Sequence, residues 1–199
     1  MLMISVDRSL PTKNRIAQIE KNKKAYYASI KAYNVCHIDL VDKLADMGLF
    51  EAPASTMLNL HNAFPGGLVD HLIRVAGYAV KLNEMLPEAL KQTKESVIRV
   101  SLLHGIGKTG LYTPCKSEWH IKNQGKMYEF NDDLVSMRVG ERSAYYCSLH
   151  GVKLNEEEYQ TIVNSDKGDN DLQSKYHSTP LAQIVKQGFE LAIFEQKHG

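Results

Sequence analysis

The segment between Gly66 and Pro87 constrains the fold of this chain more than any other part of the sequence. Its apolar residues recur every three or four positions, which is the spacing of one face of an α-helix, and Pro87 cannot continue such a helix. The stripe consists of Leu68, Leu72, Val75, Ala79 and Leu82. An apolar stripe of this length must be covered by other elements, so the segment predicts a central helix of a packed domain.

Most of the remaining sequence has the same helical periodicity. Helices are expected over 13–33, 38–48, 93–104, 131–149, 155–165 and 179–197. Thr93 is a natural N-cap, and Asn155 with Glu158 has the spacing of a capping box. Residues 119–130 are β-like around the polar loop 123–126, which predicts a hairpin. The predicted class is mostly α, with one small β-hairpin.

Composition and charge exclude several classes of protein. Of the 199 residues, 43% are hydrophobic and 24% charged, as in ordinary globular domains. The formal charge of +1 creates no strong field to attract nucleic acid or an anionic membrane. No apolar run approaches the roughly 18 residues of a membrane span. Neither nucleic acid nor a membrane is therefore an expected partner.

The cysteines and the first residues of the sequence are informative about the cellular compartment. Cys36, Cys115 and Cys147 lie far apart in the sequence and form no Cys-x-x-Cys motif. The first residues have no basic region, and their apolar run is too short for a signal peptide. A reduced, cytoplasmic protein with ordinary thiols is expected.

Two of the eight histidines, His71 and His104, stand inside apolar helical segments. A buried imidazole needs a partner, so for each of them alone a hydrogen-bonded core residue is the simpler interpretation. Two such histidines in successive apolar helices together look like half of a metal site. His61, from the loop before the central helix, is a further candidate ligand.

These segments resemble a known family, the HD-domain phosphohydrolases, which are all-α metalloenzymes named for an adjacent His-Asp pair. The resemblance begins in 50–75, which includes His71. It continues in Leu102-Leu-His-Gly-Ile-Gly-Lys108, which is similar to the family's Leu-Leu-His-Asp-Ile-Gly-Lys, and more weakly in 140–158. It covers about residues 48–195. It implies an HD-like helical domain over 36–199, preceded by an N-terminal helical arm over 1–35.

The resemblance implies a metal site and a reaction. In the family, histidines and aspartates from four helices hold one or two divalent metals such as Mn, Mg, Zn or Fe. The metal converts water to hydroxide, which attacks a phosphate ester, often a nucleotide. Carried onto this chain, His71, His104 and His61 become the candidate metal ligands. Lys108 becomes a candidate phosphate contact, helped by the backbone N–H groups of the neighbouring glycines.

The chain departs from the family at most of its anionic ligands. Gly105 replaces the aspartate of the His-Asp pair, and Val139 stands where one branch of the family has a histidine. The aspartate of the family's last helix aligns softly with Gly188. Asp166 is the one conceivable replacement ligand. Asp70 neighbours His71, but consecutive helix residues point about 100° apart, so both cannot easily face one ion.

Three hypotheses follow. In the first, the chain is a degenerate HD domain, a pseudoenzyme that has lost or weakened its metal site and binds a protein partner or a phosphorylated ligand. In the second, it is an active metal-dependent phosphohydrolase on nucleotides or related phosphate esters, with Lys108 and Asp166 in catalytic roles. In the third, it is a structural subunit that contacts its assembly through the first helix or the hairpin.

Overall fold

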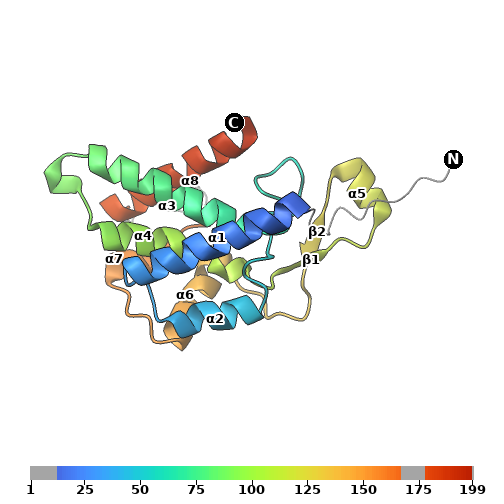
Figure 1. Cartoon of the computed structure of the whole chain (residues 1–199), viewed down its shortest axis with the longest axis horizontal. Coiled ribbons are helices and arrows are strands. Elements are labelled where there is room, and N and C mark those ends of the chain that lie inside the picture. The colour runs from blue at the N-terminus through green and yellow to red at the C-terminus, as the bar shows by residue number, and fades with distance from the viewer. Residues whose placement is uncertain (1–12, 167–177, 199) are drawn as a thin grey trace.

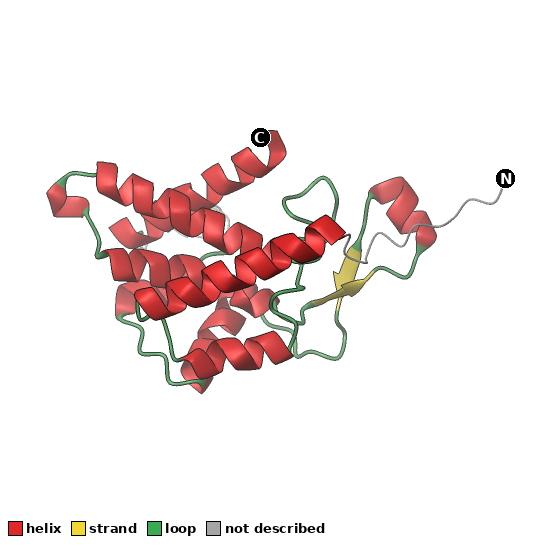
Figure 2. Ribbon diagram, viewed as in Figure 1, coloured by secondary structure: helices red, strands yellow, loops and turns green. Residues whose placement is uncertain are grey.

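Helices make up most of the chain in the computed structural model, which describes residues 13–166 and 178–198 (Figure 1, Figure 2). The three longest are α1 (Lys13–Ala32), α3 (Gly67–Met85) and α8 (Pro180–His198). The shorter elements are α2 (Ile38–Asp46), η1 (Glu88–Leu90), α4 (Lys94–Leu103), η2 (Ile106–Lys108), α6 (Val139–Leu149) and α7 (Glu156–Val163). The mostly α class is confirmed.

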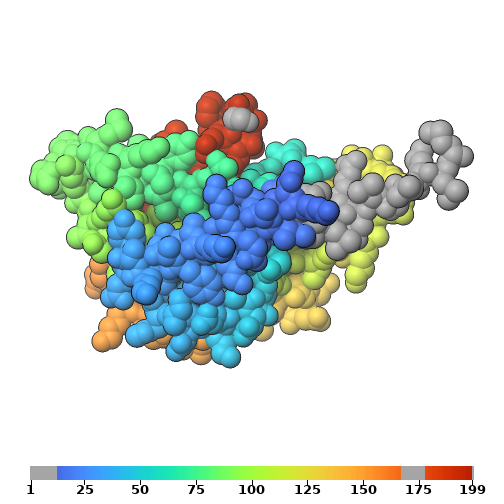
Figure 3. Space-filling view, in the orientation of Figure 1, coloured from blue at the N-terminus to red at the C-terminus, as the bar shows by residue number. Residues whose placement is uncertain are grey.

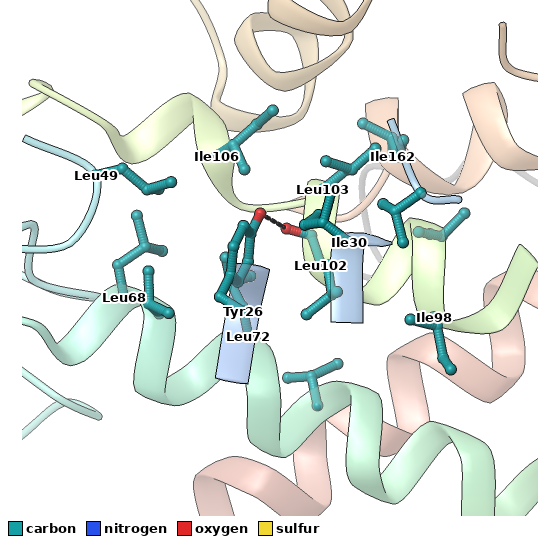
Figure 4. Packing of buried hydrophobic residues seen from close by; sticks show 14 of the residues in the cluster. Tyr26, Ile30, Leu49, Leu68, Leu72, Ile98, Leu102, Leu103, Ile106 and Ile162 are labelled. Atoms are coloured by element: carbon teal, nitrogen blue, oxygen red, sulfur yellow. Dashed lines mark hydrogen bonds between the residues drawn. The ribbon is translucent and has the colours of Figure 1, made fainter. Parts of the chain in front are cut away.

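The central helix is α3, as its apolar stripe predicts. It packs most extensively against α8 and α4 and also contacts α1. Leu68, Leu72, Val75 and Ala79 are buried. They form the core together with buried residues of α1 and α4 (Figure 4). The stripe thus fixes which helices surround the candidate site.

Helix α1 contributes to this core through Tyr26 and Ile30. The Tyr26 hydroxyl is fully buried and donates a hydrogen bond of 2.9 Å to the carbonyl of Leu102 (Figure 4). The space-filling view shows α1 and α2 side by side over much of one face of the molecule (Figure 3). Of the predicted arm 1–35, residues 1–12 lie outside the described part of the chain.

Buried polar contacts fasten α4 to α7. Glu158 is 1% exposed, and its Oε1 accepts hydrogen bonds from Arg99 at 2.8 Å and from Ser96 at 2.7 Å. Its Oε2 accepts from the backbone N–H of Asn155, which completes the predicted capping box. The predicted Thr93 cap is also present, since its hydroxyl accepts from the Ser96 N–H.

The hairpin is present, but its first strand lies earlier than predicted. β1 (Tyr112–Pro114) pairs antiparallel with β2 (Tyr128–Phe130). The predicted first strand and loop are instead helix α5 (Glu118–Gln124), which projects with the strands from one end of the bundle (Figure 1). Ser117 caps the start of α5 through the His120 N–H, and Gly125, at φ 65°, ends it. These local caps override the β-like composition.

The helix predicted over 131–149 begins only at Val139. The Asn131 side chain is the physical reason: it accepts from the Asp133 N–H and donates to the Gly110 carbonyl, which holds the backbone in a turn. The other predicted helices are confirmed within two or three residues at their ends. Among the described residues, no helix is long and apolar enough to cross a membrane.

Candidate active site

Three histidines from separate segments meet beside the core. His71 lies on α3, His104 directly follows α4, and His61 lies in the loop before α3. The ring centroids of His61 and His71 are 4.6 Å apart, and those of His71 and His104 are 6.4 Å apart. The structure therefore brings together the three histidines that the sequence singled out. We call these three residues the histidine cluster.

An aromatic ring from α8 packs against all three members of the cluster. The Phe189 centroid lies 4.8 Å from that of His71, 5.7 Å from that of His61 and 6.0 Å from that of His104. Sequence reasoning missed Phe189, because no polar side chain marks the position. The ring that α8 packs against all three histidines is thus apolar.

Gly188, with which the family's last-helix aspartate aligns, packs against α3. Gly188 faces α3, and a Cβ atom there would meet the backbone nitrogen of Ala79 at 3.0 Å and the carbonyl oxygen of Val75 at 3.1 Å. The glycine therefore serves close packing of α8 on α3 rather than a ligand site. The next residue, Phe189, faces the cluster instead, because one residue on a helix rotates a side chain by about 100°.

Hydrogen bonds orient two of the imidazoles. His104 Nδ1 lies 2.9 Å from the Ser101 carbonyl oxygen, so it carries the proton and donates. His71 Nδ1 lies 3.4 Å from Gln196 Oε1. Nε2 of His71 and Nε2 of His61 are buried without any partner. Both nitrogens are therefore available to a ligand of the cluster.

Burial makes the cluster electrically neutral. It lowers the pKa of His61 and of His104 to about 4, and the pKa of His71 well below its ordinary value, with the charge of Lys108 acting in the same direction on all three. Burial also lowers the pKa of Lys108 to about 8, against the opposing charge of Asp166. At neutral pH the site therefore holds neutral imidazoles beside one ammonium group.

Lys108 and Asp166 each have a hydrogen-bond partner in the structure. The Lys108 ammonium donates to the Ala54 carbonyl. The exposed Asp166 accepts from the Val139 N–H at the start of α6, at 3.2 Å. The expectation of free backbone donors beside Lys108 is wrong at Gly107, whose N–H donates to the Ser143 hydroxyl at 2.8 Å. Lys108 is thus the cationic group of the site.

The chemistry of these donors does not fit the divalent metal that the resemblance implies. Within 13–166 and 178–198, no three histidine, cysteine, aspartate or glutamate side chains converge closely enough to hold one ion. Gly105 supplies no carboxylate, and a Cβ atom there would meet Leu72 Cδ2 at 3.0 Å, on the apolar side of α3. The charge of the nearby Lys108 ammonium opposes a further cation. The cluster suits an anion better than a metal.

A polar cleft of about 390 Å³ adjoins the cluster between α1, α3 and α8. Asp70 lies in this cleft, where it accepts hydrogen bonds from Asn22, Asn62 and Arg74. Asp70 and His71 thus serve different sites, as their positions on the helix predict. Gln196 lines the cleft and also contacts His71, so it lies at the boundary between cleft and cluster.

The fold and the site define a class: a helical domain with a buried histidine cluster and one adjacent lysine. The chain is 32% identical over 124 residues to the dihydroneopterin 2',3'-cyclic phosphate phosphodiesterase of Methanocaldococcus jannaschii. The match covers 61% of this chain and 47% of the relative, so the chain spans about half the length of the curated relative it matches. No family model and no solved structure matches the chain.

This relative is a phosphodiesterase. It agrees with the resemblance to phosphohydrolases at the level of the reaction class. It supports the hypothesis of a hydrolase acting on phosphate esters more than the hypothesis of a degenerate pseudoenzyme.

Proposed function

We propose that the chain hydrolyses phosphate esters at the histidine cluster, with cyclic phosphodiesters as the substrate class. The observation that carries the proposal is the placement of the Lys108 ammonium beside imidazoles that are neutral at pH 7. A cation attracts the phosphoryl group, and a neutral imidazole can accept a proton. The similarity to a 2',3'-cyclic phosphate phosphodiesterase supports the same chemistry.

His104 is the general base in this proposal. Its Nδ1–H donates to the Ser101 carbonyl, which leaves the lone pair of Nε2 to accept a proton from water. The water oxygen forms a bond to phosphorus, and the bond from phosphorus to one ester oxygen breaks. The products are a phosphate monoester and a free hydroxyl group, so one water is consumed for each ring opened.

Lys108 has two tasks. Its positive charge faces the negative charge that develops on the phosphoryl oxygens, a stabilisation that is strong in a buried site. Its pKa of about 8 also makes it an acid near neutral pH, able to donate a proton to the departing oxygen. These steps use only groups of the chain itself.

The test is hydrolysis of nucleoside 2',3'-cyclic phosphates by the purified chain, followed by phosphorus NMR with and without a chelator. Replacing the base in His104→Gln should lower the rate by about 100-fold or more. The matched control is His37→Gln, because His37 is exposed and outside the cluster. Equal rates for both variants, or no hydrolysis by the unmodified chain, would contradict the proposal.

Binding without turnover is a second candidate function. The observation in its favour is Phe189, whose ring covers the histidines from α8. Saturable binding of a cyclic phosphate in calorimetry, together with no product in the NMR assay, would favour this alternative. Protein partners of the first helix or the hairpin stay a prediction from the sequence.

A further inference from the structure

The polar cleft and the histidine cluster are built back to back on the same segments. In the loop before α3, His61 belongs to the cluster and its neighbour Asn62 to the cleft. On α3, His71 belongs to the cluster and Asp70 to the cleft. Gln196, which lines the cleft and contacts His71, connects the two.

Positive and negative side chains line the cleft in equal numbers. Arg74 forms ion pairs with Asp70 at 2.9 Å and with Glu195 at 2.8 Å. The Arg15 guanidinium lies 3.5 Å above the centroid of the Phe64 ring, which gives the cleft one flat, stacked wall. A free anion in the cleft would lie near two carboxylates, and a free cation would lie near two guanidinium groups. The lining instead suits a neutral planar ring, which stacks well on guanidinium and aromatic surfaces.

Two neighbouring residues of α8 supply an acceptor and a donor for the edge of such a ring. Glu195 is half-exposed and shares only its Oε2 with Arg74. Gln196 Nε2 is a buried donor without any partner, whereas its Oε1 contacts His71. An amide nitrogen buried in this way costs stability unless a ligand accepts its hydrogen bond.

We propose that the cleft binds an amino-oxo base, a planar ring that presents an amino group, a ring N–H and an oxo group in that order on one edge, as guanine and pterin rings do. The amino edge donates to Glu195, and the oxo group accepts from Gln196. The inference rests on the proposed function in one respect: the base and the phosphate at the cluster are parts of one substrate. Arg15 comes from α1, which lies outside the segments that carry the family resemblance.

Probes without phosphate test the cleft independently of catalysis. Titration calorimetry with the full chain compares guanosine, neopterin, adenosine and cytidine. Guanosine, neopterin or both should bind at least about 10-fold more tightly than adenosine, which has no oxo group, and than cytidine, which has no ring N–H between its amino and oxo groups. A comparison of the affinities for guanosine and neopterin then shows whether the cleft prefers a guanine or a pterin ring.

Variants on α8 assign the recognition to residues. Gln196→Ala and Glu195→Gln should each weaken binding of the preferred probe by about 10-fold. Gln187→Ala and Glu190→Gln make the same chemical changes at exposed positions of the same helix and should leave binding unchanged. With the matching nucleoside 2',3'-cyclic phosphate, Gln196→Ala should raise KM more than it lowers kcat.

The outcomes separate this inference from the proposed function. Equal affinity for all four probes, or equal effects of cleft and control variants, overturns the inference, and cyclic phosphate hydrolysis can still stand. Selective binding of an amino-oxo base that depends on Gln196 supports the inference, even if no ester is hydrolysed and the proposed function fails.

Discussion

Two regions of this molecule bury polar groups in opposite ways. Between α4 and α7, Glu158 is 1% exposed, yet both of its oxygens accept hydrogen bonds, from Ser96, Arg99 and the Asn155 N–H. In the histidine cluster, Nε2 of His61 and of His71 are buried without a partner. A satisfied network supports the fold, whereas orphaned atoms cost stability and are kept where a ligand uses them.

The comparison therefore separates residues that serve the fold from residues that serve the site. It predicts that substitutions in the α4–α7 network change the free energy of unfolding and that substitutions in the cluster change chemistry. Variants of Glu158, Lys108, Gly105 and His71 test that separation.

The largest effect on stability is expected at Glu158. Glu158→Ala leaves the Arg99 guanidinium, whose side chain is 21% exposed, without its carboxylate and also removes the capping box of α7. We expect a loss of about 4 kcal/mol in the free energy of unfolding, measured by urea denaturation. Glu157→Ala, one position earlier and exposed, should change it by less than about 0.5 kcal/mol. Similar losses for both would remove the contrast.

Lys108 should show the opposite behaviour. Lys108→Met removes the charge that faces the phosphoryl group, so kcat/KM for a cyclic phosphodiester should fall by about 100-fold to 1,000-fold. The free energy of unfolding should change by no more than about 1 kcal/mol, because burial already disfavours the ammonium. Lys116→Met, at an exposed position, is the control for activity. A variant that loses stability but keeps its rate would make Lys108 a fold residue.

The sequence predicted the fold better than the site, for a physical reason. The α3 stripe and the Thr93 and Asn155 caps are local signals, and each was confirmed. The sequence alone revealed His71 and His104, because a polar residue stands out within an apolar run. Phe189 was not, since an apolar residue on an amphipathic helix looks like any core residue. The cleft was missed as well, because Arg15 and Gln196 meet only through packing of distant helices.

Gly105 tests whether the missing carboxylate alone disables a metal site. The Cβ atom of an aspartate there would lie 3.0 Å from Leu72 and 3.5 Å from Leu68. Because its polar side chain would begin in apolar surroundings, we expect Gly105→Asp to lower the free energy of unfolding by about 2 kcal/mol. The backbone itself allows the change, since φ is −106°. Mn²⁺ should not restore the melting temperature beyond its effect on Gly105→Asn. A Mn²⁺-dependent rise specific to the aspartate would reinstate the metal hypothesis.

The pH dependence of kcat/KM should have two limbs. The rate rises with pH as His104 loses its proton, around its pKa of about 4, and falls as Lys108 loses its own, around about 8. Outside these limits the rate should change about 10-fold per pH unit. In Lys108→Arg the alkaline limb should move beyond the measurable range, because arginine stays protonated. An alkaline limb that survives in that variant would belong to another group.

The smallest effect is expected at the buried imidazole of His71. His71→Leu removes an orphaned Nε2 and one long hydrogen bond to Gln196, of 3.4 Å, and keeps an apolar side chain against Phe189. These changes nearly cancel, so the free energy of unfolding at pH 7 should change by less than about 1 kcal/mol. Urea denaturation at pH 7 measures it. A large loss would place His71 with Glu158 as a residue of the fold.

The free energy of unfolding at acidic pH also shows whether His71 serves the fold or the site. Because burial lowers the pKa of His71 below its ordinary value, the unfolded chain binds a proton at this residue that the folded chain does not. Stability is therefore lost as the pH falls below about 6.5, by up to about 1.4 kcal/mol per pH unit for each such histidine. His71→Leu has one fewer of these groups, so it should become more stable than the unmodified chain as the pH is lowered toward 5. Parallel losses for both proteins would mean that His71 is already protonated in the folded state, and the cluster would then carry charge of its own.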